Sequence, residues 1–273
     1  MRVRLLSTAV VALLVASACA APGARATADP FAGEYVAVTS ESAVPVAERL
    51  TAAFASLHRG MHWTVKDVGS TATLTQLHEG QADVGFLSRA LTVQDEPYVH
   101  ALGLGFSGQV VVVHPDNPLL GLSTAQLRGI FSGAITDWAA VGGTPGPIRV
   151  LLRAESSPTR ASLDPLLRAP GGTYRADATI VANAVAMVSS VAADPRAIGI
   201  VSQPHLEGRA DARALSVDGV PPSRANVASG AYPYRRPITL VIRSNETTVR
   251  AGALGFREWV HGDEGRRLLR ELF

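Results

Sequence analysis

Four stretches of the sequence place serine, threonine or arginine directly after a run of apolar residues. These stretches are TSESAVP (39–45), VGSTAT (68–73), FLSRAL (86–91) and LLRAESSPTR (151–160). Hydroxyl groups, an arginine fork and the free N–H groups of a helix start all donate hydrogen bonds, and together they can form a dry site for a tetrahedral oxyanion. Each turn taken alone is more typical of a plain helix cap. The case for a site depends on their joint presence and on Arg153, which would otherwise need a partner at a strand end.

Residues for other chemistries do not occur in the patterns that those chemistries need. The sequence has no GxSxG motif, and the sole lysine, Lys66, stands in no SxxK pair. Its seven histidines show no HExxH or other metal-ligand spacing. We therefore expect no catalysis, no metal and no cofactor. A secreted serine hydrolase with Ser157 as the nucleophile is an alternative with little support.

The composition fits a folded chain with a large core. Of 273 residues, 47% are hydrophobic and 18% are charged, which excludes general disorder and fits two compact domains better than one. Without Arg2 and Arg4, which lie in a stretch that we expect to be removed, 23 basic residues face 23 acidic ones. A chain with no net charge lacks the single-sign field that binds nucleic acid or an anionic membrane surface.

The turns need elements that hold them together in space. From Glu34 onward, short β-rich runs alternate with helical patterns at the spacing of βα units and a mainly parallel sheet. The predicted strands are 34–40, 62–68, 83–88, 108–113, 148–153, 179–181, 197–202 and 237–242. The predicted helices are 46–57, 71–80, 123–131, 158–167, 183–193 and 247–273, the last broken near Gly262. The stretch 207–236 is predicted to be a loop with at most one strand.

Two sets of βα units predict two lobes with a cleft between them, where the carboxyl ends of strands collect ligands. We expect lobe one to contain residues 33–108, lobe two to contain 109–236, and the chain to return to lobe one, with a C-terminal helix, over 237–273.

The N-terminus has the pattern of an export signal. Residues 1–18 run from two arginines through an apolar block to small residues, which predicts a secretory signal peptide. The small residues before Cys19 resemble the bacterial lipobox, in which this cysteine is acylated, although ordinary cleavage nearby is the alternative. Cys19 is the only cysteine, so no internal disulfide can form. Residues 19–32 suit a flexible tether. We expect an exported protein, lipid-anchored on the outer face of the cell membrane or periplasmic.

The segment RAESSPT (153–159) resembles the RADGSGT-type turn of the phosphate-binding proteins that serve high-affinity phosphate ABC transporters. Further similar segments follow the same order along nearly all of residues 34–273; they are LSTAQLRGIFSGAITDW (122–138), AIGIVS (197–202), YPYRRPITLVI (232–242) and a final helix with FREWV and DEG. The resemblance implies a two-lobed, type II periplasmic-binding-protein fold, with a hinge of crossing segments. It also implies capture of inorganic phosphate or a similar oxyanion for an ABC transporter permease.

The resemblance also implies which residues bind the anion. Carried over by position, they are the Val44 N–H, Ser70, Arg153, Ser157 and Thr159. The further candidate residues for the site are Ser42, Thr71 and Arg89. Three departures bear on selectivity. Ala43 replaces a threonine, for which Ser42 can substitute, and Pro158 replaces a glycine whose N–H reaches the anion. Arg89 stands near the place of an aspartate that accepts a proton from phosphate.

These departures leave alternatives open. Arg89 either adds positive charge to the cleft or pairs with Glu41, Asp95 or Glu96 at its rim. A surface sensor or adhesin with the same fold and a degraded pocket is an alternative function.

Overall fold

The computed structural model describes residues 28–155, 157–168 and 171–273. The predicted signal peptide and Cys19 lie outside these ranges, as does most of the predicted tether. Among the described residues, no helix combines the length and the apolar character needed to cross a bilayer.

The strands form one long sheet and a small two-stranded ribbon. In chain order they are β1 (Gly33–Thr39), β2 (Met61–Asp67), β3 (Val84–Leu87), β4 (Val99–Val113), β5 (Gly121–Leu122), β6 (Arg149–Arg153), β7 (Thr179–Val181), β8 (Ala197–Ser202), β9 (Arg213–Ala214), β10 (Ser216–Val217) and β11 (Arg235–Arg243). The helices are α1 (Val44–Leu57), α2 (Ser70–His78), α3 (Thr124–Ser132), α4 (Pro158–Leu167), α5 (Ala184–Ala192), α6 (Arg224–Ser229), α7 (Ala251–His261) and α8 (Asp263–Leu272).

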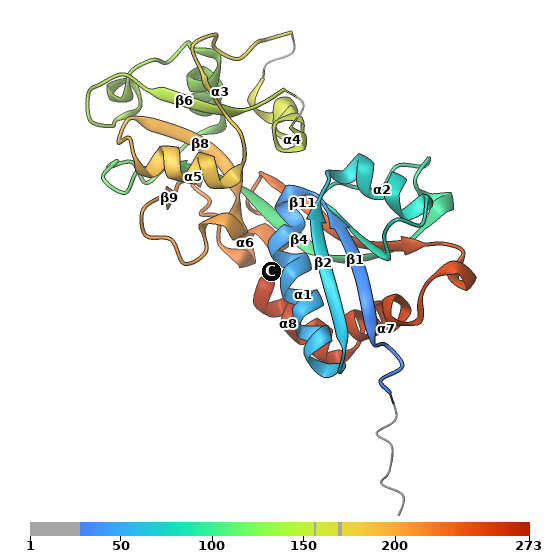
Figure 1. Cartoon of the computed structure of the whole chain (residues 1–273). Coiled ribbons are helices and arrows are strands. Elements are labelled where there is room, and N and C mark those ends of the chain that lie inside the picture. The colour runs from blue at the N-terminus through green and yellow to red at the C-terminus, as the bar shows by residue number, and fades with distance from the viewer. Residues whose placement is uncertain (1–27, 156, 169–170) are drawn as a thin grey trace, which may run out of the picture.

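The order of strands in the long sheet is β2-β1-β3-β11-β4-β8-β6-β7, with β9 beside β4. At one end β1 pairs in parallel with β2 and β3, and at the other β6 pairs in parallel with β7 and β8. Between these two parallel groups, β11 and β4 run antiparallel to their neighbours. These two strands connect two bodies of structure (Figure 1), so the fold is the predicted two-lobed α/β fold with crossing strands.

Each body has its own hydrophobic core. One core joins residues between Tyr35 and Leu104 with residues between Ile238 and Val260, and we call this body lobe one. The other core lies between Val110 and Tyr234, and we call this body lobe two. Each fully buried Leu, Val or Phe side chain in these cores contributes on the order of 1.5–3 kcal/mol. The predicted boundaries at 108 and 236 remain a proposal, because β4 and β11 run through both lobes without a linker.

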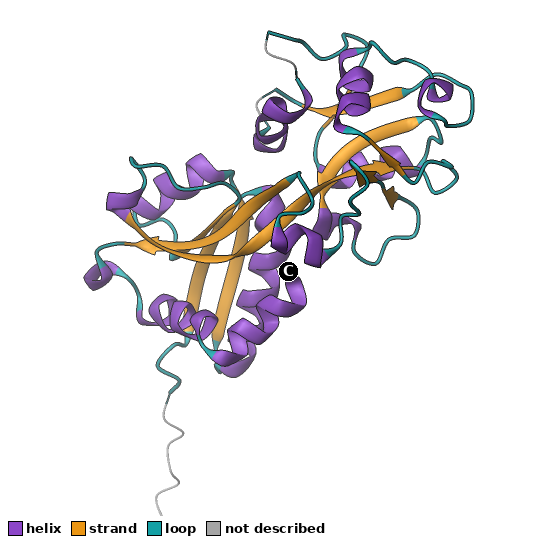
Figure 2. Ribbon diagram, turned by 180° about the vertical axis from the view of Figure 1, so that it is seen from behind, coloured by secondary structure: helices purple, strands orange, loops and turns teal. Residues whose placement is uncertain are grey.

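Helices cover both faces of the sheet in lobe one (Figure 2). Phe54 of α1 and Phe256 of α7 pack edge to face on one side, with ring centroids 5.5 Å apart. Leu77 of α2 packs on the other side, against Val38 and Val241. A parallel sheet covered on both faces explains why the inner strand β3 is buried along its whole length.

Most predicted elements coincide with observed ones, including the helix break at Gly262. Two regions differ. Strand β4 begins at Val99, nine residues before the predicted start, because its first half is an exposed, glycine-containing stretch without an apolar run. The predicted loop 207–236 contains β9, β10 and α6, and α6 buries only Val227, too little for a visible helical pattern.

Candidate functional site

A cavity of about 360 Å³ lies between the lobes, at the carboxyl ends of both groups of parallel strands. Lobe one contributes the turns that follow β1, β2 and β3, and lobe two those that follow β6 and β7. The lining residues are Ser40, Glu41, Ser42, Asp67, Val68, Gly69, Ser88, Arg153, Ala154, Ser157, Thr159, Ala182 and Arg236. Such strand ends are where α/β folds collect ligands. Sequence order, strand direction and the two-lobed arrangement together create this cavity.

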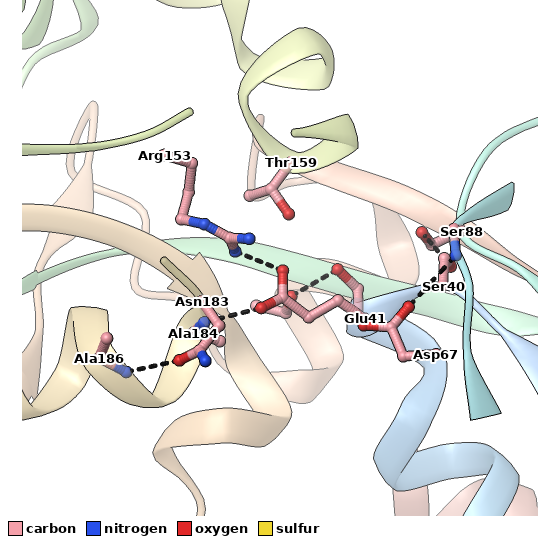
Figure 3. A network of polar contacts seen from close by, with 12 residues as sticks. Ser40, Glu41, Asp67, Ser88, Arg153, Thr159, Asn183, Ala184 and Ala186 are labelled. Carbon is pink, nitrogen blue, oxygen red and sulfur yellow. Dashed lines mark hydrogen bonds and ion pairs between the residues drawn. The ribbon is translucent and has the colours of Figure 1, made fainter. Parts of the chain in front are cut away.

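An ion pair crosses the cavity from one lobe to the other (Figure 3). Glu41, in a short 3-10 turn after β1, accepts a hydrogen bond on Oε2 from Nη1 of Arg153, at the end of β6. Its other oxygen, Oε1, accepts from the backbone N–H of Ala184, the first residue of α5, at 2.7 Å. Both oxygens of the Glu41 carboxylate are therefore held by donors of lobe two.

Arg236, at the start of the crossing strand β11, is the most buried cation of the lining, with 5% of its surface exposed. One of its terminal nitrogens, Nη2, donates to Oγ of Ser42, and it lies 3.2 Å from both Gln109 Oε1 and Thr159 Oγ1. Burial lowers the pKa of Arg236 to about 10, an effect that the negative charge of Glu41 opposes. The side chain stays protonated at neutral pH, so it holds a positive charge on the cavity wall.

Several buried donors at the cavity have no hydrogen-bond partner among the residues that the structure describes. We call these the orphan donors; they are Ser157 Oγ, Arg153 Nε and Arg236 Nε. A buried polar group without a partner costs about 1–3 kcal/mol, so native proteins rarely keep one without a use. Three donors, two from the turn at the end of β6 and one from a crossing strand, are gathered at one cavity, as an anion with several oxygens needs.

Two further titratable groups face the same region. Burial raises the pKa of Asp67, and the nearby charge of Glu41 raises it further, whereas a hydrogen bond from the Gly69 N–H, at 3.3 Å, opposes the rise. Burial lowers the pKa of His205, so this imidazole is neutral at neutral pH. The lining thus carries two arginines and two carboxylates, Arg153 and Arg236 against Glu41 and Asp67.

Four of the residues predicted from the sequence line the cavity: Ser42, Arg153, Ser157 and Thr159. Ser70 follows the lining residue Gly69 directly and is buried at the start of α2. The Ser42 hydroxyl already has partners, since it accepts from Ser202 at 2.7 Å as well as from Arg236. The binding role of these residues stays a prediction.

Three further predicted residues lie outside the lining as well. The Val44 N–H donates to the Glu41 carbonyl oxygen at the start of α1. Thr71 is exposed on α2 and lines another hollow, which Ser70 also lines. Arg89 pairs with Asp95 in its own lobe, with Nη1 2.7 Å from Oδ2, which was one of the two alternatives for this residue.

Sequence reasoning missed Glu41, Asp67 and Arg236 as lining residues. Glu41 follows β1 and Asp67 ends β2, the same kind of position that identified the serines. They were not taken as binding groups because carboxylates do not donate hydrogen bonds. Arg236 precedes an apolar strand in YPYRRPITLVI, and an arginine at such a position needs buried partners.

Comparison with known proteins gives consistent results. The profile of the PBP superfamily domain matches residues 24–264. The chain is 30% identical over 170 residues to the phosphate-binding protein PstS of Bacillus subtilis, an alignment that covers 60% of this chain and 55% of that protein. The chain therefore spans about half the length of this curated relative.

Two solved structures have similar folds. One comes from Clostridium perfringens, is named as a phosphate ABC transporter substrate-binding protein and contains bound phosphate. It is 25% identical, with a TM-score of 0.74 over 85% of this chain and 95% of that chain. The other is an ABC-type phosphate transport receptor from Vibrio cholerae, 26% identical, with a TM-score of 0.68 over 88% and 98% of the two chains.

Proposed function

Because the chain belongs to the PBP superfamily, we propose that its cleft captures a tetrahedral oxyanion and that this oxyanion is inorganic phosphate. The observation that carries the proposal is the set of orphan donors, which lack partners within the described ranges. They belong to residues that line one cavity. The phosphate named for the relatives from B. subtilis, C. perfringens and V. cholerae supports the same anion.

The proposed site divides the work between its residues. Arg153 and Arg236 supply positive charge, and the hydroxyls of Ser157 and Ser70 supply neutral donors that fit an oxygen of any protonation state. Thr159 and Ser157 stand at the start of α4, where free N–H groups favour negative charge. Pro158 has no N–H, so this helix start has one donor fewer than a glycine there would give.

The proposed mechanism is closure of the two lobes around the anion. Donors on lobe one and lobe two contact the same guest only when the lobes are close, so the closed arrangement gains contacts that the open one lacks. The crossing strands β4 and β11 are the segments about which the lobes can rotate. No covalent bond is made or broken.

The captured anion is proposed to pass to the permease of an ABC transporter. The signal-like residues 1–18 and the lipobox-like stretch before Cys19 support export and a lipid anchor on the outer face of the membrane. Residues 19–32, the predicted tether, would then connect that anchor to the body of lobe one.

Isothermal titration of the purified chain tests the proposal. The protein is unfolded and refolded in phosphate-free buffer to remove carried-over anion, then titrated with phosphate, sulfate and molybdate. We expect saturable binding of one phosphate per chain. A folded chain that binds none of these anions would contradict the proposal and favour a sensor or adhesin. Turnover of a phosphoester that is lost in Ser157→Ala would instead favour the hydrolase.

A further inference from the structure

The carboxylate of Glu41 occupies donors that suit an oxyanion. A carboxylate presents two oxygens to a guanidinium in the same planar geometry as an edge of phosphate. In the structure, one oxygen of Glu41 is bound by Arg153 and the other by the Ala184 N–H, at the N-terminus of a nine-residue helix. These are the two kinds of donor that proteins commonly use for phosphate.

We propose that Glu41 is an internal anion, which competes with the captured oxyanion for Arg153 and the α5 N-terminus and holds the two lobes together until it is displaced. This inference rests on the proposed function, because competition requires an external anion. It adds a specific residue, Glu41, that lowers the affinity of the site.

The charges of the lining support competition. While Glu41 is bound to Arg153, their charges cancel, and the remaining charged residues of the lining are Arg236 and Asp67. A doubly charged anion then meets a wall with no net charge. Once Glu41 leaves Arg153, the guanidinium of Arg153 is free to bind the anion. The backbone N–H of Ala184 is then also free to donate to it.

The position of Glu41 in the chain supports its role as a contact between the lobes. It lies in lobe one, 112 residues before Arg153 and 143 before Ala184, both in lobe two. Its side chain is 19% exposed and that of Arg153 is 13% exposed, so water screens this pair less than a surface ion pair. Breaking the pair therefore changes both the charge of the cavity and the contact between the lobes.

The test is titration with phosphate and sulfate of Glu41→Gln, Glu41→Asp and the parent chain. Gln keeps an oxygen for the Ala184 N–H but loses the charge, and Asp keeps the charge but is one methylene shorter. We expect Glu41→Gln to bind both anions roughly ten-fold more tightly, since a charge-assisted hydrogen bond no longer has to be broken. Glu41→Asp should also bind more tightly, by a smaller factor.

Glu48→Gln is the matched control, because it removes one negative charge from an exposed position of α1 in the same lobe. We expect it to bind like the parent. If Glu41→Gln binds no more tightly than the parent, or more weakly, Glu41 instead positions Arg153 and the competition is refuted. If Glu41→Asp is unchanged while Glu41→Gln gains, general repulsion rather than occupation of the donors is at work.

A measurement without anion separates this inference from the proposed function. In phosphate-free buffer, the thermal unfolding midpoints of Glu41→Gln, Arg153→Gln and the double variant form a cycle. We expect the two single changes to be non-additive, as for residues in direct contact. Additive midpoints would refute the contact between the lobes whether or not the chain binds anions. If no variant binds any anion, both the proposed function and the competition are refuted. The cycle of unfolding midpoints still tests the contact between the lobes in that case.

Discussion

The turns after β6 and after β3 each contain an arginine near the end of a strand, but the two arginines bind partners in different parts of the molecule. Arg153 ends β6, is mostly buried, and reaches across the cavity to lobe one. Arg89 follows β3 and bends back to Asp95, six residues later in its own lobe, and to the carbonyl oxygen of Ala90. The difference comes from the local partner: the Asp95 carboxylate also accepts from the Thr92 N–H, which fixes it beside Arg89.

An arginine at the end of a strand is therefore not a binding residue by its position alone. Arg153 has a buried Nε without a partner in the described part of the chain, whereas the head group of Arg89 is occupied by a nearby acid. A cation contributes to anion capture when its remaining hydrogen-bond donors face a cavity. A cation whose charge is already neutralised at the rim contributes mainly to local order.

The largest expected effect is that of Arg153→Ala on anion binding. Loss of a charge-assisted hydrogen bond costs about 1.5–3 kcal/mol, so we expect phosphate affinity to fall about 10- to 150-fold in isothermal titration. The matched variant Arg89→Ala removes the same charge and fork from the other turn and should change affinity less than about two-fold. Equal losses in the two variants would remove the distinction between the turns.

A second prediction concerns the arginine that is most deeply buried in the lining. Arg236→Met keeps most of the side-chain volume but removes the charge and its hydrogen bonds to Ser42, Gln109 and Thr159. We expect phosphate affinity to fall about ten-fold, as for one charged donor. Stability should stay within about 1 kcal/mol, because relief from burying a charge without a paired carboxylate offsets the lost hydrogen bonds. Urea unfolding measured beside the titration checks both parts.

An outcome in which Arg236→Met unfolds the protein but leaves affinity unchanged in the folded fraction would assign Arg236 to structure alone. Arg235→Met is the neighbouring control. Arg235 stacks on Phe106 and donates to carbonyl oxygens of α6, away from the cavity lining, so its loss should not weaken phosphate binding.

The smallest effect is expected for the acid that occupies Arg89. Hydrogen bonds from Arg89 lower the pKa of Asp95 to about 2, so folding favours its ionised form. That stabilisation is present above the ordinary pKa near 4 and is lost as pH falls toward 2. Asp95→Asn should therefore cost about 1 kcal/mol at pH 7, since Arg89 is partly exposed, and leave phosphate affinity unchanged.

Chemical unfolding of the parent and Asp95→Asn between pH 7 and pH 2 measures this difference. We expect the two stabilities to converge as the pH falls below about 4. A constant difference over this range would show that the ionised form of Asp95 is not what stabilises the turn.

Local patterns predicted much of the fold and part of the site. Strand β8 and helix α4 coincide with the predicted ranges. Ser157 and Thr159, which line the cavity, were predicted from a serine-rich turn after an apolar strand together with the resemblance of that turn to a family motif. Glu41 was missed because its role depends on Arg153, 112 residues away, and no local pattern records that pairing. The sequence left open whether Arg89 faces the cleft or pairs with an acid, because Glu41, Asp95 and Glu96 were all possible partners. Only the folded turn selects Asp95.

The most direct test of the account is a crystal structure of the chain grown with phosphate. The account predicts one phosphate in the cavity between the lobes, with its oxygens within hydrogen-bond distance of Arg153 and Ser157, and with the Glu41 carboxylate no longer bound to Arg153. Phosphate bound elsewhere, or an Arg153 that keeps Glu41 as its partner while phosphate occupies the cleft, would contradict it.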